Sequence, residues 1–174
     1  MASAPQTLTL KRNRDREGLA WHAWVRRGLL ALLAVVLALA LANVFGQRPH
    51  VSLASSPDAR LKVFAPIHAR SGLVYAARFH IYAIHELKHA TLVLDPGWAE
   101  GYTFNGSVPG ALTEASRDGR LVFDFGHIPA GKSLIYFVSL QVNPTNVGRR
   151  TQNVELDDGS RRLLTIHRNI TIFP

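Results

Sequence analysis

A run of nineteen residues without a charge, from Gly28 to Gly46, constrains this chain more than any other feature of its sequence. Nearly all of the run is Leu, Ala or Val, and these residues surround a helix on every side instead of forming the single stripe of a soluble helix. A helix of this length spans roughly 28 Å, close to the hydrocarbon thickness of a bilayer, and satisfies its own backbone hydrogen bonds in lipid. The run predicts a transmembrane helix over residues 28–46, which we interpret as an uncleaved signal anchor.

Positive charge gathers on the N-terminal side of this run. Residues 1–27 carry six basic side chains against two acidic ones, whereas Arg48 alone follows the run closely. The positive-inside rule therefore predicts a single-pass protein of the cell membrane, with residues 1–27 as a cytoplasmic tail and the C-terminal domain outside the cytoplasm. Four side chains of the tail are expected at the membrane interface, where aromatic rings and cations meet lipid headgroups: Trp21, Trp24, Arg26 and Arg27.

A cleaved signal peptide is the alternative to an anchor. Ala40-Leu41-Ala42 matches the A-x-A pattern that precedes a cleavage site. The apolar run is longer than a usual signal core and continues through Val44 and Phe45, which favours an intact helix. Both alternatives export the C-terminal domain, and they differ only in the fate of the helix near Ala42.

The exported part has the size and charge of one ordinary globular domain. About 125 of the 174 residues remain after the tail and the apolar run, enough for a hydrophobic core without cross-links. The chain has no cysteine, which excludes disulfides, thiolate zinc sites and cysteine nucleophiles. From His50 onward there are thirteen basic and ten acidic residues, a net charge of +3 that argues against nucleic acid as a partner.

The exported part also has the sequence pattern of β-structure. Residues 47–58 are rich in Pro and Ser and predict a short tether. Beyond them apolar residues alternate with polar ones, and Gly, Pro and Asp-Gly turns separate the runs, which predicts an all-β domain over residues 59–174. We expect an antiparallel immunoglobulin-like β-sandwich of seven to eight strands, with a small barrel as the alternative. The candidate strands are residues 73–84, 91–94, 102–104, 120–125, 133–142, 153–157 and 162–173.

One position conflicts with this alternation. In the final run Leu164, Ile166, Ile170 and Ile172 share a face, and Arg168 falls on that face. A charged side chain among core positions indicates a bulge or a sheet edge at Arg168.

The pentapeptide from His85 to His89, HELKH, matches the H-E-x-x-H pattern of zinc metallopeptidases. On a helix the two histidines share one face and can chelate zinc, while Glu86 polarises the attacking water. Here a strand pattern ends at Ile84 and another begins at Thr91, which leaves no room for that helix. We therefore expect a polar loop, no catalytic residues and no cofactor, and keep a zinc site of His85, His89 and His80 as the alternative.

Trp98 and Tyr102 follow the Pro96-Gly97 turn and are candidates for a partner- or glycan-binding surface. Exposed aromatic rings stack on sugar rings and anchor protein partners. The competing interpretation, which we favour, is that Trp98 closes one end of the sandwich core.

Four phrases of the domain together resemble a known group of proteins: LVLDPGWAEGYTFNGSVP, LVFDFGHIPAGKS, VSLQVNPTNVGRR and the terminal ITIFP. They are similar to uncharacterised bacterial single-pass membrane proteins with an immunoglobulin-like ectodomain, and the likeness covers about residues 60–174. The resemblance implies the fold and an accessory role at the cell surface, and it carries over no catalytic residue.

These observations favour a membrane-anchored, non-enzymatic protein of the envelope. We expect the sandwich to bind or support another membrane or envelope protein, since edge strands and loops of such domains are natural docking surfaces. The lipid bilayer is the other expected partner. A zinc-dependent hydrolase and a glycan-binding module remain the alternatives, and the sequence leaves the oligomeric state open.

Overall fold

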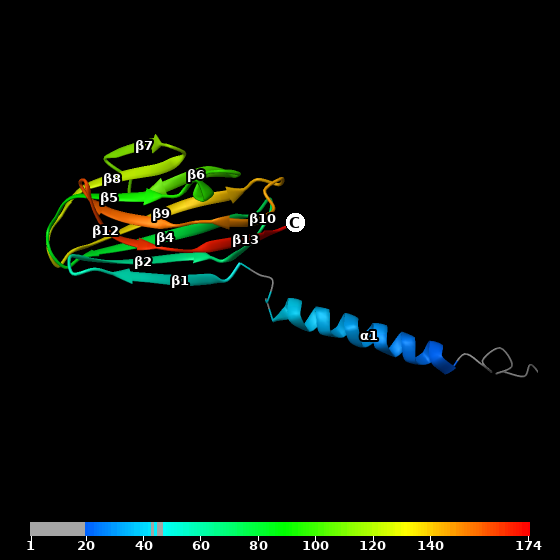
Figure 1. Cartoon of the computed structure of the whole chain (residues 1–174). Helices are drawn as coiled ribbons and strands as arrows, with labels where there is room; N and C mark the ends of the chain where they lie inside the picture. The colour runs from blue at the N-terminus through cyan, green and yellow to red at the C-terminus, as the bar shows by residue number, and fades with distance from the viewer. Residues whose placement is uncertain (1–19, 43, 45–46) are drawn as a thin grey trace, which may run out of the picture. The chain divides into compact units, whose positions relative to one another are not determined.

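A computed structural model describes residues 20–42, 44 and 47–174 of the chain (Figure 1). The chain divides after Val44 into two compact units; among the described residues, the first contains one helix and the second contains the β-strands. The first nineteen residues, most of the expected cytoplasmic tail, lie outside the described residues.

The helix, α1, comprises Ala20–Leu41 and is rich in the strong helix formers Leu and Ala. Its segment Trp21–Leu41 has a mean hydropathy of 2.0 and none of it is buried, so α1 is long and apolar enough to cross a membrane. Its bounds differ from the expected 28–46. The helix includes residues 20–27, and at its other end the N–H of Val44 donates to the carbonyl of Leu39. This wider i→i−5 turn is typical of a helix C-terminus and ends α1 before the apolar run ends.

The β unit contains two five-stranded sheets and one three-stranded sheet, and all paired strands are antiparallel except β13 and β3. The first sheet has the order β1 (Pro49–Ser55), β2 (Ala59–Pro66), β4 (Val74–Ala83), β9 (Ser133–Val142) and β6 (Tyr102–Val108). The second sheet has the order β12 (Arg161–Ile166), β11 (Val154–Asp158), β5 (Leu87–Leu94), β8 (Arg120–Ile128) and β7 (Thr113–Arg117). The small sheet has the order β10 (Gly148–Thr151), β13 (Asn169–Phe173) and β3 (His68–Arg70).

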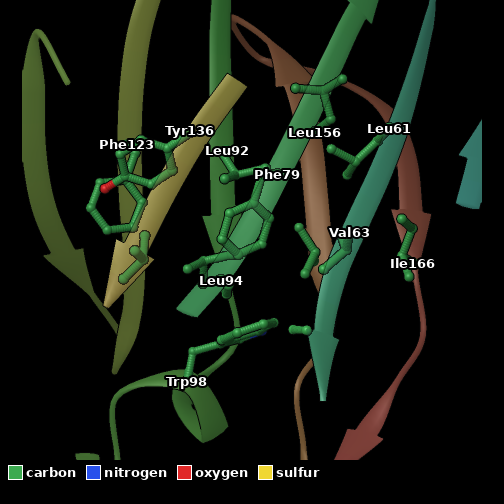
Figure 2. Packing of buried hydrophobic residues seen from close by; sticks show 14 of the residues in the cluster. Leu61, Val63, Phe79, Leu92, Leu94, Trp98, Phe123, Tyr136, Leu156 and Ile166 are labelled. Carbon is green, nitrogen blue, oxygen red and sulfur yellow. The ribbon is translucent and has the colours of Figure 1, made fainter. Parts of the chain in front are cut away.

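The core lies between the two large sheets. Alternate residues of β4 and β9 are buried, as the period-two pattern predicts, and the ring of Phe79 packs against Leu92 and Leu94 of the facing sheet (Figure 2). A short 3₁₀ helix, η2 (Pro96–Trp98), inserts Trp98 at one end of this core, 5.4 Å from Phe79 between ring centroids. The expected all-β antiparallel class is confirmed.

Several expected boundaries were wrong. Residues 49–55, expected within a tether, form strand β1, and every residue of β1 pairs with β2. The described residues form thirteen strands instead of seven or eight, because short strands such as β3, β7 and β10 are polar or exposed and lack a clear alternation. The final run, expected as one strand over residues 162–173, is divided at His167-Arg168 into β12 of the second sheet and β13 of the small sheet.

Candidate functional site

The HELKH pentapeptide spans a turn and the start of a strand. His85 lies in the turn after β4, whereas β5 begins at Leu87, whose side chain is buried in the core. The nitrogen Nδ1 of His85 lies 3.3 Å from Asp58, and Glu86 pairs with His127 at 2.8 Å. Because residues 85–89 are not helical, the two histidines of the pattern are not brought one helical turn apart as a metallopeptidase requires.

His80, the third candidate ligand, lies on β4 and points away from the core. It stands in register between Lys62 of β2 and Ile135 of β9. Within residues 20–42, 44 and 47–174, no three His, Cys, Asp or Glu side chains gather closely enough to hold a metal ion. The zinc hypothesis therefore has no coordinating cluster in the part of the chain that is described.

Trp98 and Tyr102 are interior residues, which corrects the hypothesis that they form an exposed recognition surface. Trp98 is 0% exposed, and its indole Nε1–H donates to the carbonyl of Asn153 at 3.2 Å. Tyr102 is 8% exposed, and its hydroxyl accepts a hydrogen bond from Gln152 at 3.4 Å. Neither ring is available to a sugar, because the surrounding core already covers both faces.

Gln152 and Arg168 hold a buried polar cluster next to Trp98. The amide Nε2 of Gln152 donates to the hydroxyls of Tyr75 and Tyr102, and burial raises the pKa of both phenols. Arg168 lies 5.0 Å from the centroid of the Trp98 ring, and burial lowers the pKa of its guanidinium to about 10. The cluster is enclosed by core residues, so we assign it to the stability of the fold.

The outer face of the first sheet is the candidate functional site. Strand register aligns five outward positions in one row that crosses the whole sheet, from β1 to β6: Val51, Phe64, Arg78, Phe137 and Val108. With strands about 4.8 Å apart, this row is roughly 19 Å long. It is apolar except at its centre, where the guanidinium of Arg78 lies 4.0 Å from the centroid of the Phe64 ring.

A second row on the same face combines apolar and basic residues. Its members are Leu53, Lys62, His80 and Ile135. The aliphatic residues and Phe137 of the two rows are well exposed, between 42% for Ile135 and 67% for Val108. A hollow of about 210 Å³ lies at one side of this row. It is lined by Lys62 and His80 of the row and by Arg60 and Tyr82 next to them.

The face carries positive charge with no negative charge. The five strands of the first sheet contain Arg60, Lys62 and Arg78 but no Asp or Glu. Among the described residues, no carboxylate lies within ion-pair distance of these three cations. We call the two rows together with Arg60 and Tyr82 the cationic face.

The second sheet differs in this respect, because it carries charges of both signs and some of them pair with one another. Its strands contain five basic and five acidic residues. Glu155, which is 5% exposed, binds Arg120 at 2.9 Å and Arg162 at 2.8 Å, and Arg120 also binds Asp95 at 3.0 Å. Equal numbers of basic and acidic residues leave the strands of this sheet without net charge, whereas the cationic face has only positive charges, for which an external partner can compensate.

No pattern in the sequence alone predicts the cationic face as a whole. The available signal was in β9, where Ile135 and Phe137 are apolar although they occupy positions that alternate with the core residues. A strand with apolar residues on both sides has a second surface to cover. What the sequence could not show is that β1, β2 and β4 place further apolar and basic residues beside them.

Comparisons with known proteins identify no family. No protein-family model matches the chain, and no curated protein matches it. Among solved structures, the chain is similar to AvmM, which catalyses macrocyclization in alchivemycin A biosynthesis, with a TM-score of 0.45, 7% identity and coverage of 74% of this chain and 90% of AvmM. It is also similar to a non-cellulosomal cohesin from the hyperthermophilic archaeon Archaeoglobus fulgidus, with a TM-score of 0.39, 13% identity and coverage of 73% and 92% respectively.

Proposed function

We propose that this chain is a membrane-anchored, non-enzymatic envelope protein whose cationic face binds an acidic surface of another envelope protein. In this proposal α1 is the single anchor, its basic N-terminal flank stays in the cytoplasm, and the β unit is outside. Trp21, Trp24, Arg26 and Arg27, which are exposed on the first turns of α1, lie at the membrane interface. The single observation that carries the binding function is the acid-free, partly apolar outer face of the first sheet.

The composition of the cationic face favours a protein partner. Aromatic residues and arginine are enriched at the cores of protein interfaces, and here Phe64, Phe137 and Arg78 occupy the middle of the row. The unpaired cations Arg60 and Lys62 stand at one side, where carboxylates of a partner gain complementary charge. The proposed partner therefore presents apolar side chains flanked by Asp or Glu.

The immunoglobulin-like topology expected from the sequence is part of this proposal. Its support is the pair of antiparallel sheets that enclose the core without a disulfide. The glycan-binding alternative has lost its candidate residues, because Trp98 and Tyr102 are buried. The zinc alternative lacks its helix, because β5 begins within the HELKH pentapeptide.

Charge reversal on the cationic face tests the proposed function. The full chain is expressed in its native membranes as wild type, as K62E/R78E, and as the matched control K88E/R117E, whose two positions are exposed on the second sheet. Wild type and control are expected to migrate in native gels as one larger complex with a partner protein, and K62E/R78E is expected to migrate without it. Near-ultraviolet circular dichroism confirms that each variant is folded, and K62Q/R78Q gives an intermediate loss if the effect is electrostatic.

Two outcomes would overturn the proposal. One is a complex that survives in K62E/R78E as well as in the control. The other is a membrane ligand: if the wild-type chain in nanodiscs floats with separate phosphatidylglycerol vesicles, and K62E/R78E does not, the cationic face binds lipid instead of protein.

A further inference from the structure

A second basic site lies on the other side of β1. Successive residues of a strand point to opposite sides, so His50 points away from the cationic face to which Val51 belongs. On that side is a hollow of about 340 Å³ between β1 and the small sheet. Its lining includes His50, His68, Arg149, His167 and Thr171.

Strand register brings these side chains together. Thr171 of β13 is paired with Arg149 of β10 on one side and with His68 of β3 on the other, so the three form one row across the small sheet. His167 lies in the short link before β13, and His50 approaches from β1. The row forms because β13 pairs with β10 on one side and with β3, about a hundred residues earlier in the chain, on the other. No local sequence pattern predicts this strand order.

The chemistry of the lining favours an anion. None of the nine residues that line the hollow is acidic. The guanidinium of Arg149 is exposed and offers several N–H donors in a fixed plane, and an imidazole donates a hydrogen bond in both of its charge states. A metal ion is disfavoured because the guanidinium repels it, and because the described histidines do not gather into a set of three ligands.

We propose that this hollow binds a phosphate group. Three imidazoles, the exposed guanidinium of Arg149 and the hydroxyl of Thr171 supply more donors than a carboxylate can accept in one plane, whereas a tetrahedral phosphate presents oxygens in all directions. The buried Arg168 also lines the hollow. The volume is about ten times the roughly 30 Å³ that one water occupies in the liquid, so the hollow accommodates a phosphate ester and not only the bare ion. The ester is either a soluble metabolite or a lipid headgroup, which share the same phosphate chemistry.

Titration of the full chain with inorganic phosphate tests this site. The chain is held in micelles of a maltoside detergent, which contains no phosphate, and its histidine side chains are observed by NMR. Phosphate is expected to shift the signals of His50, His68 and His167 together. R149Q is expected to weaken binding at least tenfold, since it removes the exposed permanent charge of the hollow and leaves only the buried Arg168, while the control R117Q on exposed β7 leaves the affinity within twofold.

A second variant controls for misfolding, and a measurement in nanodiscs identifies the source of the phosphate. H68Q removes one donor but no permanent charge and is expected to weaken binding less than R149Q does. In nanodiscs that contain one quarter phosphatidylglycerol, a headgroup site shifts the same three signals before phosphate is added, whereas a site for a soluble ester responds only to sn-glycerol 3-phosphate. The proposal is overturned if R149Q and R117Q bind phosphate equally, if the shifts occur at other histidines, or if Zn²⁺ binds stoichiometrically and phosphate does not. None of these outcomes bears on the cationic face, so the two proposals fail separately.

Discussion

The guanidinium of Arg168 lies 5.0 Å from the centre of the Trp98 ring, inside the fold and at the point where the chain leaves the second sheet for the small sheet. Its Nη2 donates to the carbonyls of Ala65 at 3.2 Å and Pro66 at 2.7 Å. These carbonyls belong to the end of β2, so a single side chain connects the C-terminal strands to the first sheet. Backbone acceptors at Nη2 and an aromatic face replace part of the water of this buried guanidinium, whereas its Nε and Nη1 are buried without a hydrogen-bond partner among the described residues.

Removal of this arginine is expected to destabilise the domain. Arg168→Leu keeps an apolar stem but leaves the two carbonyls without their donor, and we expect a loss of about 2–4 kcal/mol in the free energy of unfolding. Arg168→Lys restores the charge without the planar fork and is expected to recover less than half of the loss. The measurement is urea unfolding of the full chain followed by Trp98 fluorescence in a Trp21→Phe, Trp24→Phe background. Equal stability of Arg168→Leu and the parent would contradict this role.

Gly97 is expected to tolerate no side chain. A Cβ at this position would overlap the carbonyl oxygen of Thr151 at the end of β10. Gly97→Ala therefore has to displace β10, and we expect a loss of about 2 kcal/mol or more. Gly110 is the matched control because nothing lies within 4 Å of a Cβ there, and Gly110→Ala is expected to change the unfolding free energy by less than about 0.5 kcal/mol. The same urea experiment measures both, and a similar small effect at the two glycines would contradict the close approach.

Glu155 is the centre of the ion network on the second sheet. Its carboxylate is nearly buried between Arg120 and Arg162, so Glu155→Gln leaves two guanidinium groups without their shared anion. We expect a loss of about 2–4 kcal/mol, measured by urea unfolding. Glu86→Gln breaks an exposed pair with His127 and is the control, with an expected change below about 1 kcal/mol. A loss at Glu86 as large as that at Glu155 would show that burial does not determine the effect.

Tyr136 is expected to make the domain sensitive to alkaline pH. Burial raises the pKa of Tyr136 from 10.0 to about 12, so the folded state keeps this proton where the unfolded state has lost it. A raised folded pKa contributes stability that is full below pH 10 and is lost as the pH rises through 12. Comparison of wild type with Tyr136→Phe isolates this one group. As the pH rises from 10 to 12, the difference in unfolding free energy between the two should change by roughly 2–3 kcal/mol in favour of the variant. Urea unfolding at a series of pH values from 9 upward measures it, and a constant difference would exclude the linkage.

Local patterns of the sequence were sufficient for the long central strands. The alternation from Leu134 to Val142 predicts β9 at its observed bounds, because one side of this strand is buried from Tyr136 onward and Leu134 packs against the same core. Strand β1 was mistaken for a tether because Pro49, Ser52 and Ser55 are typical of linkers, and its strand character depends on pairing with β2. Edge strands in general are defined by one neighbour and less by their own composition.

The site depends on contacts that no local pattern contains. Arg168 was visible as a charge on an apolar face, but its acceptors are backbone carbonyls about a hundred residues earlier. The row from Val51 to Val108 likewise requires the strand order of the first sheet, in which β9 lies beside β4 and β6. Composition from His50 onward, at a net charge of +3, conceals the fact that one sheet has no acidic residue and the other has five.

The central claim, that the cationic face binds an acidic protein surface, is tested most directly by site-specific photo-crosslinking in native membranes. A photoreactive phenylalanine analogue is placed at Ile135, in the middle of the cationic face, and at Arg117 on β7 as the control. We expect one discrete protein adduct from position 135 alone, with Asp or Glu in the crosslinked peptide, and we expect this adduct to be lost when K62E and R78E are added. Adducts of equal yield from positions 135 and 117, an adduct that survives K62E/R78E, or crosslinks from position 135 to lipid alone would contradict it.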